Sequence, residues 1–463
     1  MRERIQQLGL LAAGAVVGVM LSLNFSAEAN KTPATPLPIE ELRTFTEVFG
    51  RIKSDYVENI DDKKLITEAI NGMLSGLDPH SAYLDPDNFK ELQAGTQGEF
   101  GGLGIEVGME DGFVKVVSPI EDSPASRAGL KPGDLIIKLD DTPVKGMSIN
   151  DAVKRMRGKP DTDITVTILR KGEPKPFPVK LTRAVIKTQS VKSKLLESGY
   201  GFVRITQFQE HTGEDLAKAI KKLYAENKQD LKGLVLDLRN DPGGLLNAAV
   251  GVSGAFLPKN ALVVYTDGRT DDAKMKLFSV PESYVRNGAD YLADLPAGIK
   301  TVPMVVLING GSASASEIVA GALQDHKRAA VMGSQSFGKG SVQTILPLGG
   351  NAAIKLTTAR YFTPNGRSIQ AKGITPDIAV EDANGEGAGR VREADLQRHL
   401  GNPNGGEEKK SEPAKPADAA KPAAPANPLG QPQPQAPVEF GSPGDTLTTQ
   451  AVNLLKGVSI IKP

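Results

Sequence analysis

The chain has 463 residues, enough for about two or three domains, and the composition of an ordinary soluble protein. Apolar residues make up 39% of it, and 55 lysines and arginines balance 55 aspartates and glutamates. This balance disfavours nucleic acid or an anionic membrane surface as a partner, because both select for a basic excess. The absence of cysteine excludes thiol catalysis and thiolate metal sites.

The first 29 residues have the pattern of a secretory signal peptide. Arg2 and Arg4 precede an uncharged apolar run over residues 8–25, and an Ala-Glu-Ala sequence ends at Ala29. The run also reaches the lower limit for a membrane span, so an uncleaved anchor stays open as an alternative. Both interpretations place the bulk of the protein outside the cytoplasmic membrane, and we expect a periplasmic location, with the membrane contacted only through this segment.

Residues 30–95 are expected to form a linker and an N-terminal helical segment. A polar, proline-rich spacer covers residues 30–38, and residues 39–92 have apolar side chains at helical spacings of three and four. Small exported helices of this type usually serve packing or dimerisation. We therefore expect this segment to support a homo-oligomer.

Residues 96–185 have a different character, with short β-rich runs such as DLIIKLDD and DITVTILRK broken by glycine and proline turns. A sequence with the form of a capping box begins at Ser148 and predicts one helix between these runs. The apolar face of that helix would present Ile149, Val153 and Met156. The segment is expected to be a small β-rich domain.

Strands and helices alternate over residues 186–380. The runs interpreted as strands, several of them continuously apolar, are YGFVRITQF, LKGLVLDLR, ALVVYTD, PMVVLING and RAAVMG. Helical patterns lie between them in EDLAKAIKKLYAEN, LLNAAVGVSGAFL and SASEIVAGALQDHK. Continuously apolar strands with helical crossovers predict a mainly parallel sheet that is covered on both faces.

The chain loses these patterns from about residue 381. Residues 381–444 include a long stretch rich in proline, alanine and glutamine and are expected to be a disordered linker. An amphipathic helix is predicted for residues 445–463. An apolar helix tethered by such a linker is more often a docking or assembly element than part of a core, so we expect it to support oligomerisation.

Three alternate serines occur in I-N-G-G-S-A-S-A-S-E, residues 308–317, where a predicted strand meets a predicted helix. Main-chain N–H groups at a helix N-terminus stabilise developing negative charge, which favours a nucleophile there. Serine is also a preferred helix cap. This stretch alone leaves open whether one serine is a nucleophile or all three are structural.

The four histidines offer little support for a base. His326 lies about 18 Å from Ser314 along the same predicted helix, at 1.5 Å per residue. His80 and His211 are not excluded by distance, but neither has an evident carboxylate partner in the sequence, and His399 is in the tail. A Ser-His-Asp triad is therefore unsupported.

Lys339 is a stronger candidate for the base. In S-Q-S-F-G-K-G-S-V-Q it has apolar and glycine neighbours, no acid lies within ten residues on either side, and Gln343 could orient its amine. Its pKa would have to fall from about 10.4 to between about 7 and 8, which requires desolvation or a nearby cation. The alternative is an ordinary turn lysine.

A Pro-Gly-Gly turn follows the run L-V-L-D-L-R-N-D and could supply oxyanion donors. It joins a predicted strand to a helix at the carboxyl edge of the sheet, where ligands bind in α/β folds. A plain connection between a strand and a helix would have a similar sequence.

Together these segments resemble the carboxyl-terminal processing proteases, also called tail-specific proteases, a family of serine peptidases with a Ser-Lys dyad. The motifs, in family order over residues 40–380, are MLSGLDPHSAYL, GEFGGLGIEV, LVLDLRNDPGG, NGGSASASEIVAGAL, SFGKGSVQ and RYFTPNGRSIQAKGITPDI. The resemblance implies a multidomain α/β fold. Its parts would be a crotonase- or Clp-like protease core over residues 186–380, a β-rich PDZ domain and an N-terminal helical segment.

The resemblance also implies the roles of individual residues. The nucleophile, its general base, the supporting glutamine and the two main-chain oxyanion donors would be Ser314, Lys339, Gln343, Ala315 and Gly243. Ser312 and Ser316 would then be structural, and Glu317 would buttress the site. Neither a metal nor an organic cofactor is expected.

The resemblance identifies residues 96–185 as a PDZ domain. In F-G-G-L-G-I, glycines let successive main-chain N–H groups converge on an anion, so a peptide C-terminus could dock there as an added strand. The expected binding residues are Gly102, Leu103, Gly104, Ile105, Ile149, Val153 and Met156.

We therefore expect an exported serine endopeptidase that captures substrates by their free C-terminus and cleaves near it. Its partners would be protein substrates, further copies of itself and, as one candidate, an activating adaptor protein. The resemblance implies that placement of the PDZ domain gates the site. Two alternatives stay open: a catalytically silent PDZ scaffold, and an acyl-hydrolase on the similar crotonase-like fold.

Overall fold

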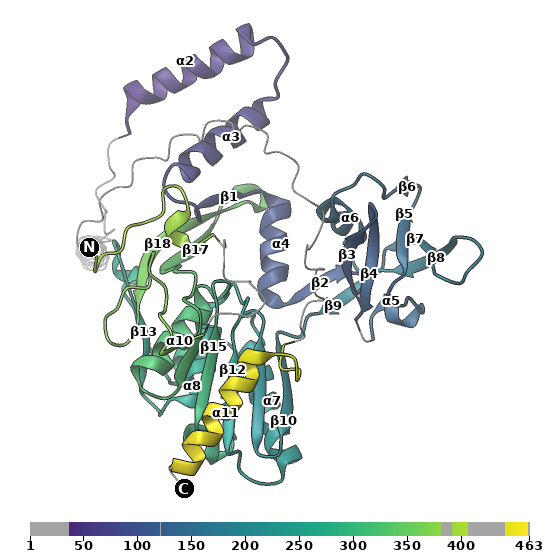
Figure 1. The fold of residues 1–463 in the computed structure, drawn as a ribbon. Coiled ribbons are helices and arrows are strands. Elements are labelled where there is room, and N and C mark those ends of the chain that lie inside the picture. The colour runs from purple at the N-terminus through teal and green to yellow at the C-terminus, as the bar shows by residue number, and fades with distance from the viewer. Residues whose placement is uncertain (1–36, 121, 381–390, 406–439, 462–463) are drawn as a thin grey trace, which may run out of the picture. The chain divides into compact units, whose positions relative to one another are not determined.

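The computed structural model describes residues 37–120, 122–380, 391–405 and 440–461 (Figure 1). The predicted signal peptide or anchor and most of the predicted disordered linker lie outside the described residues. Among the residues that are described, no helix is both long and apolar enough to cross a membrane. The chain divides into two compact units, Met1–Ala69 and Ile70–Pro463.

The described part of the first unit consists of α2 (Ile39–Asp55) and the beginning of α3 (Asp62–Ser75). No residue of α2 is buried. Leu42, Phe45 and Val48 lie on one helical face and are 46%, 51% and 52% exposed. α2 thus presents an apolar face that nothing in the described chain covers.

Residues 82–84 lie within the segment predicted to be helical but form strand β1 (Ala82–Leu84), followed by α4 (Pro86–Gln97). The helical prediction is wrong here because the Asp78 carboxylate accepts the main-chain N–H groups of His80 (2.8 Å) and Ser81 (2.9 Å). Such side-chain bonds stabilise a turn in place of a helix.

A β-rich domain follows, as the sequence predicts. Its antiparallel sheet contains β3 (Ile105–Glu110), β4 (Phe113–Pro119), β5 (Leu135–Leu139), β7 (Asp163–Leu169) and β8 (Phe177–Thr182), with β6 (Thr142–Pro143) beside β5. The predicted helix is α6 (Ile149–Met156), and the N–H of Asp151 donates to Ser148 Oγ at its start (3.2 Å). The short α5 (Pro124–Arg127) completes the domain, and β2 (Glu99–Gly102) pairs with β9 (Ala184–Lys187) where the chain enters and leaves it.

A six-stranded sheet forms the centre of the following part of the chain. Its order is β10 (Val191–Glu197), β11 (Tyr200–Ile205), β12 (Gly233–Asp237), β15 (Met304–Ile308), β16 (Ala330–Gly333) and β19 (Ile378–Ala379). All neighbouring strands are parallel except β10 and β11. The prediction of a mainly parallel sheet within a multidomain α/β fold is confirmed.

Helices cover both faces of this sheet (Figure 1). The helices α7 (Thr212–Asn227), α8 (Leu246–Phe256) and α10 (Ala315–Asp325) lie on one face, and α11 (Thr446–Ile461) lies on the other. Adjacent residues of a strand point to opposite faces. In β15, Val306 therefore packs in the cluster with α8 and α10, whereas Val305 packs with α11. The two-sided cover explains why these strands are continuously apolar.

Strand β13 (Leu262–Gly268), one of the strands predicted beside the parallel ones, belongs to a second sheet that is antiparallel. It pairs with β14 (Lys276–Phe278) and β18 (Ala353–Phe362), and β17 (Ser341–Pro347) and β1 also pair with β18. The sequence analysis missed β17 and β18 because polar residues interrupt their apolar ones. β17 begins just after Lys339, so this sheet helps to position it.

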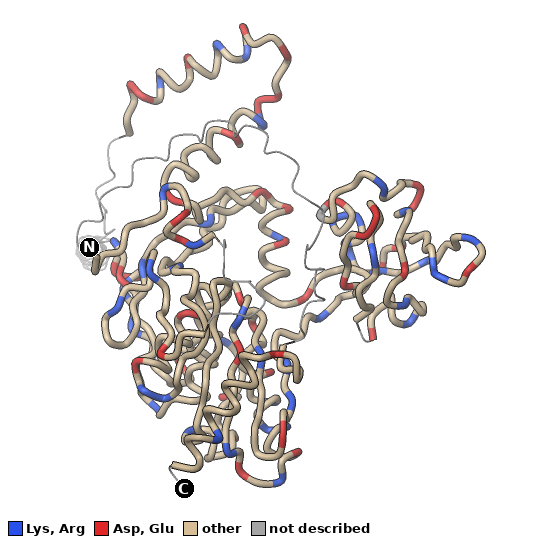
Figure 2. Tube along the Cα trace, viewed as in Figure 1, with Lys and Arg blue, Asp and Glu red and all other residues tan. Residues whose placement is uncertain are grey.

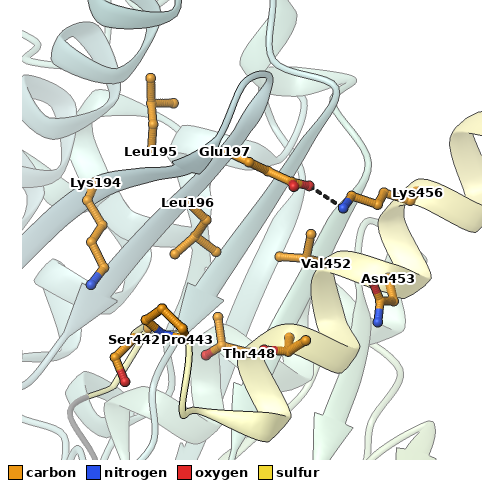
Figure 3. Close-up of a pocket in the computed structure, with 12 residues that line it drawn as sticks. Lys194, Leu195, Leu196, Glu197, Ser442, Pro443, Thr448, Val452, Asn453 and Lys456 are labelled. Carbon is orange, nitrogen blue, oxygen red and sulfur yellow. Dashed lines mark ion pairs between the residues drawn. The ribbon is translucent and has the colours of Figure 1, made fainter.

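Helix α11 is part of the core and not a free docking element. Leu447, Ala451 and Leu455 are buried against the sheet, and Lys456 pairs with Glu197 of β10 at 2.6 Å (Figure 3). A cavity of about 380 Å³ lies between β10 and the α11 segment. The sequence-based expectation that the apolar face of α11 serves assembly is wrong, because that face packs on the sheet of the same chain. An amphipathic pattern does not reveal whether the helix packs on its own chain or on another.

Residues 391–405 also differ from the expected disordered linker. They contain a short 3-10 helix, Glu393–Asp395, and Glu393 is completely buried. A buried charge leaves no apolar pattern in the sequence, so this packed segment could not be distinguished from the linker around it.

Candidate active site

Ser314 lies where β15 ends and α10 begins. It occupies the N-cap position of α10 with φ 55° and ψ −112°. Residues other than glycine rarely adopt such a conformation, and strain of this kind occurs where a tight turn presents a reactive side chain. A capping serine would occupy the same position, so its neighbours decide between the two interpretations.

The flanking serines fix this turn to the segment that follows β12. Ser312 Oγ donates to the main-chain oxygen of Leu238 (2.8 Å), and Ser316 Oγ donates to the main-chain oxygen of Asp241 (3.0 Å). Both serines are fully buried, whereas Ser314 is partly exposed. Of the three, Ser314 alone is open to a substrate.

The Pro-Gly-Gly turn places the two predicted oxyanion donors together. A Cβ atom built on Gly243 would lie 2.8 Å from the main-chain nitrogen of Ala315 and 2.8 Å from Cβ of Ser314. Gly243 also has a φ of 96°, a left-handed conformation that favours glycine. Both the space and the backbone conformation therefore require glycine at this position.

The N–H of Gly243 already has an acceptor in this arrangement. It donates to Oδ1 of Asp241 at 2.8 Å. Oδ2 of that buried carboxyl has no hydrogen-bond partner among the described residues, and burial raises the pKa of Asp241 to about 8. The N–H of Gly243, one of the two predicted oxyanion donors, is thus bonded to Asp241 in this structure. Sequence reasoning missed this contact.

Glu317 joins the serine to the predicted base. Its Oε2 accepts the main-chain N–H groups of both Ser314 (2.8 Å) and Lys339 (2.9 Å). Its Oε1 accepts the N–H of Gly338 (2.7 Å) and the hydroxyl of Ser336 (2.5 Å). The side chain is fully buried, and burial raises its pKa to about 7. One carboxylate therefore fixes two segments that are distant in sequence.

Tyr361 of β18 contacts the same two residues. Its hydroxyl donates to the main-chain oxygen of Lys339 and interacts with the side chain of Ser314. The ring is fully buried, and burial raises the pKa of the hydroxyl well above its ordinary value. Sequence reasoning assigned Tyr361 no role, although it lies in the motif RYFTPNGRSIQ.

The surroundings of the Lys339 amine favour its neutral form, because burial lowers its pKa to about 8. Nζ donates to Oε1 of Gln343 at 2.5 Å and to the main-chain oxygen of Ser341 at 3.4 Å. Gln343 is held in turn by Thr357, whose Oγ1 lies 3.1 Å from Nε2. Within the described residues Nζ makes no hydrogen bond to Ser314, so the two predicted dyad residues are joined here through the Glu317 carboxylate that accepts both their main-chain N–H groups.

Three segments of the sequence match known families. Residues 199–380 match Peptidase family S41, residues 101–181 match the PDZ domain, and residues 11–88 match the activating protease CtpB N-terminal domain. A carboxy-terminal-processing protease of Bartonella bacilliformis is 50% identical over 369 residues, which cover 79% of this chain and 81% of that protein. The carboxy-terminal processing protease CtpB of Bacillus subtilis is 36% identical over 388 residues, which cover 82% and 77%.

The chain belongs to the carboxy-terminal processing proteases of family S41. It is a serine peptidase with a PDZ domain, which confirms the family expected from its motifs. Membership disfavours both alternatives that the sequence left open, the silent scaffold and the acyl-hydrolase.

The PDZ domain of this S41 peptidase contains a small groove of about 90 Å³. Of the predicted binding residues, all but Ile149 line it: Gly102, Leu103, Gly104, Ile105, Val153 and Met156. Phe100, Val107 and Arg157 were missed, although Val107 shares a strand face with Ile105 and could have been found from that alternation. The N–H groups of Leu103 and Gly104 have no acceptor among the described residues.

The sequence-based interpretation found no carboxylate partner for His80 or His211, but the structure shows one for each. His211 lies 3.7 Å from Glu214 in an exposed pair. Nε2 of His80 lies 2.8 Å from Oε2 of Glu393. The statement that His80 has no carboxylate partner is therefore wrong, because the partner lies in the packed segment 391–405. His326 contacts the main-chain oxygen of Leu262 (2.7 Å).

Proposed function

We propose that this S41 peptidase captures the free C-terminus of a protein substrate in its PDZ groove and cleaves nearby, with Ser314 as nucleophile and Lys339 as general base. The bridging carboxylate of Glu317 carries the proposal, since one oxygen accepts the N–H groups of both residues. It supports a dyad because it fixes a strained serine beside a lysine whose pKa burial lowers to about 8.

In the proposed mechanism neutral Lys339 takes the proton of Ser314 Oγ as Oγ attacks the substrate carbonyl carbon. The N–H groups of Gly243 and Ala315 stabilise the negative charge that develops on the carbonyl oxygen. The Lys339 ammonium then protonates the departing amine, which leaves an acyl-enzyme. Lys339, neutral again, removes a proton from the water that hydrolyses the ester, while Gln343 orients the amine.

Two contacts must change before this reaction can begin. Nζ of Lys339 has to approach Ser314 Oγ while it still donates to Gln343, and the N–H of Gly243 has to leave Asp241. We infer that substrate capture by the PDZ domain favours this rearrangement. The bonds described here then belong to the peptidase without substrate.

The PDZ groove has the features that C-terminal capture needs. Apolar side chains line it for the last side chain of the substrate, and the unpaired N–H groups of Leu103 and Gly104 suit a carboxylate. Lysines and arginines are interspersed with aspartates and glutamates along the described chain (Figure 2). We therefore assign recognition to the groove.

Two substrates that differ only at the C-terminal carboxylate test the capture. Both carry the same apolar final residues, but one ends in a free carboxylate and the other in an amide. A hydrogen bond to a charged group contributes about 1.5–3 kcal/mol, so kcat/KM should fall by roughly tenfold or more for the amide. Equal values for the two substrates would exclude C-terminal capture.

We further propose that the peptidase is exported and acts on exported proteins in the periplasm. Residues 1–29 support this because they have the pattern of a signal peptide. Mass spectrometry of the N-terminus from soluble and membrane fractions distinguishes the alternatives. Cleavage after Ala29 leaves Asn30 as the first residue, whereas a retained segment 8–25 indicates an anchor.

We also propose that the peptidase forms a homo-oligomer through the apolar face of α2. The exposure of Phe45 and its neighbours supports an interface there. Phe45→Asp should reduce the mass measured by light scattering to that of a monomer, and Glu47→Lys, on another face, should not. An unchanged mass in Phe45→Asp argues against this interface. An activating adaptor is a further candidate partner, and full activity of the purified chain alone would argue against one.

A further inference from the structure

A cluster of charged groups next to Lys339 is built from two segments that are distant from it in sequence. His80 follows α3, and Glu393 lies in the short 3-10 helix of the packed segment 391–405. Nε2 of His80 lies 2.8 Å from Oε2 and 3.0 Å from Oε1 of Glu393. The Glu393 side chain is 1% exposed and the His80 side chain 18%.

Glu393 is linked to the main chain on both sides of Lys339, directly on one side and through Gln370 on the other. Its N–H donates to the carbonyl oxygen of Phe337 at 3.1 Å. Nε2 of Gln370 donates to Oε1 of Glu393 (2.8 Å), while Oε1 of Gln370 accepts the N–H of Gly340 (3.0 Å). The carboxylate of Glu393 therefore has a fixed place relative to the lysine.

A buried carboxylate at this place raises the pKa of Lys339 and so disfavours its neutral form. A negative charge favours the ammonium form, and little water screens the attraction here. Burial lowers the pKa of Lys339, and Lys355 lowers it further, whereas Glu393, Glu317 and Asp78 raise it. Of these three carboxylates Glu393 raises it most.

The three carboxylates differ in how their charge is compensated. Glu317 has four neutral donors, and Asp78 has the hydroxyls of Ser81 (2.7 Å) and Thr357 (3.0 Å) together with two main-chain N–H groups. Burial raises the pKa of Glu393, but the hydrogen bonds from His80 and Gln370, together with charge interactions with His80 and Lys339, outweigh this effect and lower the pKa below its ordinary value. Of the three, Glu393 alone has a hydrogen-bond partner in the described residues that can carry a positive charge.

We propose that His80 is a positioning residue that compensates the charge of Glu393, so that Lys339 can be neutral when it acts as the base. This rests on the proposed role of Lys339. The Nε2 proton of His80 draws the charge of the carboxylate away from the lysine. Without that proton, the carboxylate would raise the pKa of Lys339 and so favour the ammonium form, which cannot accept the proton of Ser314.

The dependence of kcat/KM on pH tests the proposal, measured on one protein substrate for the wild type, His80→Gln, Glu393→Gln and the double variant. Wild-type activity should rise as the pH increases through about 8, the pKa to which burial lowers Lys339. In His80→Gln this rise should move up by about one pH unit, a roughly tenfold loss at neutral pH. In Glu393→Gln and in the double variant it should move to a lower pH than in the wild type, because the carboxylate that raises the pKa of Lys339 is gone.

If kcat/KM rises at the same pH in the wild type and in all these variants, the His80–Glu393 pair is purely structural and the proposal is overturned, whatever the overall rates of the variants. His211→Gln is the matched control, because His211 lies 3.7 Å from Glu214 in an exposed pair. Its pH profile should equal that of the wild type. If His80→Gln fails to fold, Glu393→Gln alone decides, since its rise must then move to lower pH.

Lys339→Ala distinguishes failure of this inference from failure of the proposed function. Wild-type activity in Lys339→Ala would show that another group is the base, and the proposed mechanism would be wrong. If that residual activity disappears on adding His80→Gln, His80 is itself the base and the compensating role is also wrong. An inactive Lys339→Ala, combined with a shifted profile in His80→Gln, supports both.

Discussion

Burial gives the Lys339 amine a chemistry that an exposed lysine lacks. A pKa of about 8 leaves a useful fraction of neutral amine near neutral pH. Lys339→Arg should be inactive at every pH, because a guanidinium does not lose its proton in this range. The assay is cleavage of a protein substrate between pH 6 and pH 10, with Lys327→Arg at the end of α10 as the control. Substantial turnover by Lys339→Arg would show that Lys339 is not the base.

Asp241 should make the stability of the peptidase depend on pH. Burial raises its folded-state pKa to about 8, whereas the unfolded value is about 3.9. Between these values the folded state binds more protons than the unfolded state, so stability falls as the pH rises towards 8. Asp241→Asn cannot titrate.

The measurement for Asp241 is the change in Tm between pH 5 and pH 8. The wild type should lose more than Asp241→Asn over this interval. Burial also raises the pKa of Glu317, to about 7. Its effect on stability has the same sign in the wild type and in Asp241→Asn, so it cancels when their losses of Tm are compared. Equal losses would mean that Asp241 is ionised over the whole interval.

The sequence identified some residues of the site and missed others for a physical reason. Ser314 and Lys339 stood out because their neighbours are small or apolar and because they lie in motifs. Tyr361 and Glu393 act through contacts with residues far along the chain, and although the bond of Asp241 to Gly243 is local, the burial that raises its pKa comes from the tertiary structure. Periodicity and composition report local surroundings, so they contain no information about such contacts.

At the scale of elements, the C-terminal helix is tied to the strand that leads into the oxyanion turn. Arg239, which follows β12, is 1% exposed and bonds the carboxylates of Asp237 (2.8 Å) and Asp445 (2.6 Å). Its guanidinium carbon lies 4.5 Å from the centre of the Phe440 ring. Burial raises the pKa of Asp445, but the hydrogen bonds from Arg239 and its neighbours lower it to about 2.

Removing one partner of this buried ion pair should be costly. Asp445→Ala leaves the Arg239 guanidinium without one of its two carboxylates, and we expect a loss of about 3–5 kcal/mol in the free energy of unfolding. Lys456→Ala breaks the Glu197 pair on the same helix, whose side chains are 43% and 41% exposed, and should cost at most about 1 kcal/mol. Urea denaturation measures the free energy of unfolding of both variants. Similar losses in the two would contradict the burial of the Arg239–Asp445 pair.

Element prediction succeeded where the local pattern and the tertiary structure agree. The strands β12 and β15 and the helix α10 were predicted because two-sided burial and amphipathic packing leave distinct periods in the sequence. β1 and β17 were missed because they depend on pairing with β18. The placement of α11 was wrong because its apolar face fits equally well on this chain or on another.

At the scale of the whole molecule, recognition and cleavage are assigned to different domains of one chain. In the proposed mechanism the PDZ groove holds the C-terminus of the substrate, and the Ser314 site cuts the substrate chain. The sequence predicted both domains from motifs and periodicity. It also predicted the contact between Lys339 and Gln343, but it could not predict that Gly243 is bonded to Asp241, because that bond describes one state of the site.

The most direct test of the account is a comparison of wild type and Ser314→Ala on a protein that ends in an apolar residue with a free carboxylate. Mass spectrometry of the products over time shows whether and where the substrate is cut. We predict cleavage near the C-terminus by the wild type and a loss of at least about 10³-fold for a folded Ser314→Ala. Equal cleavage by the two proteins would contradict the central claim that Ser314 is the nucleophile.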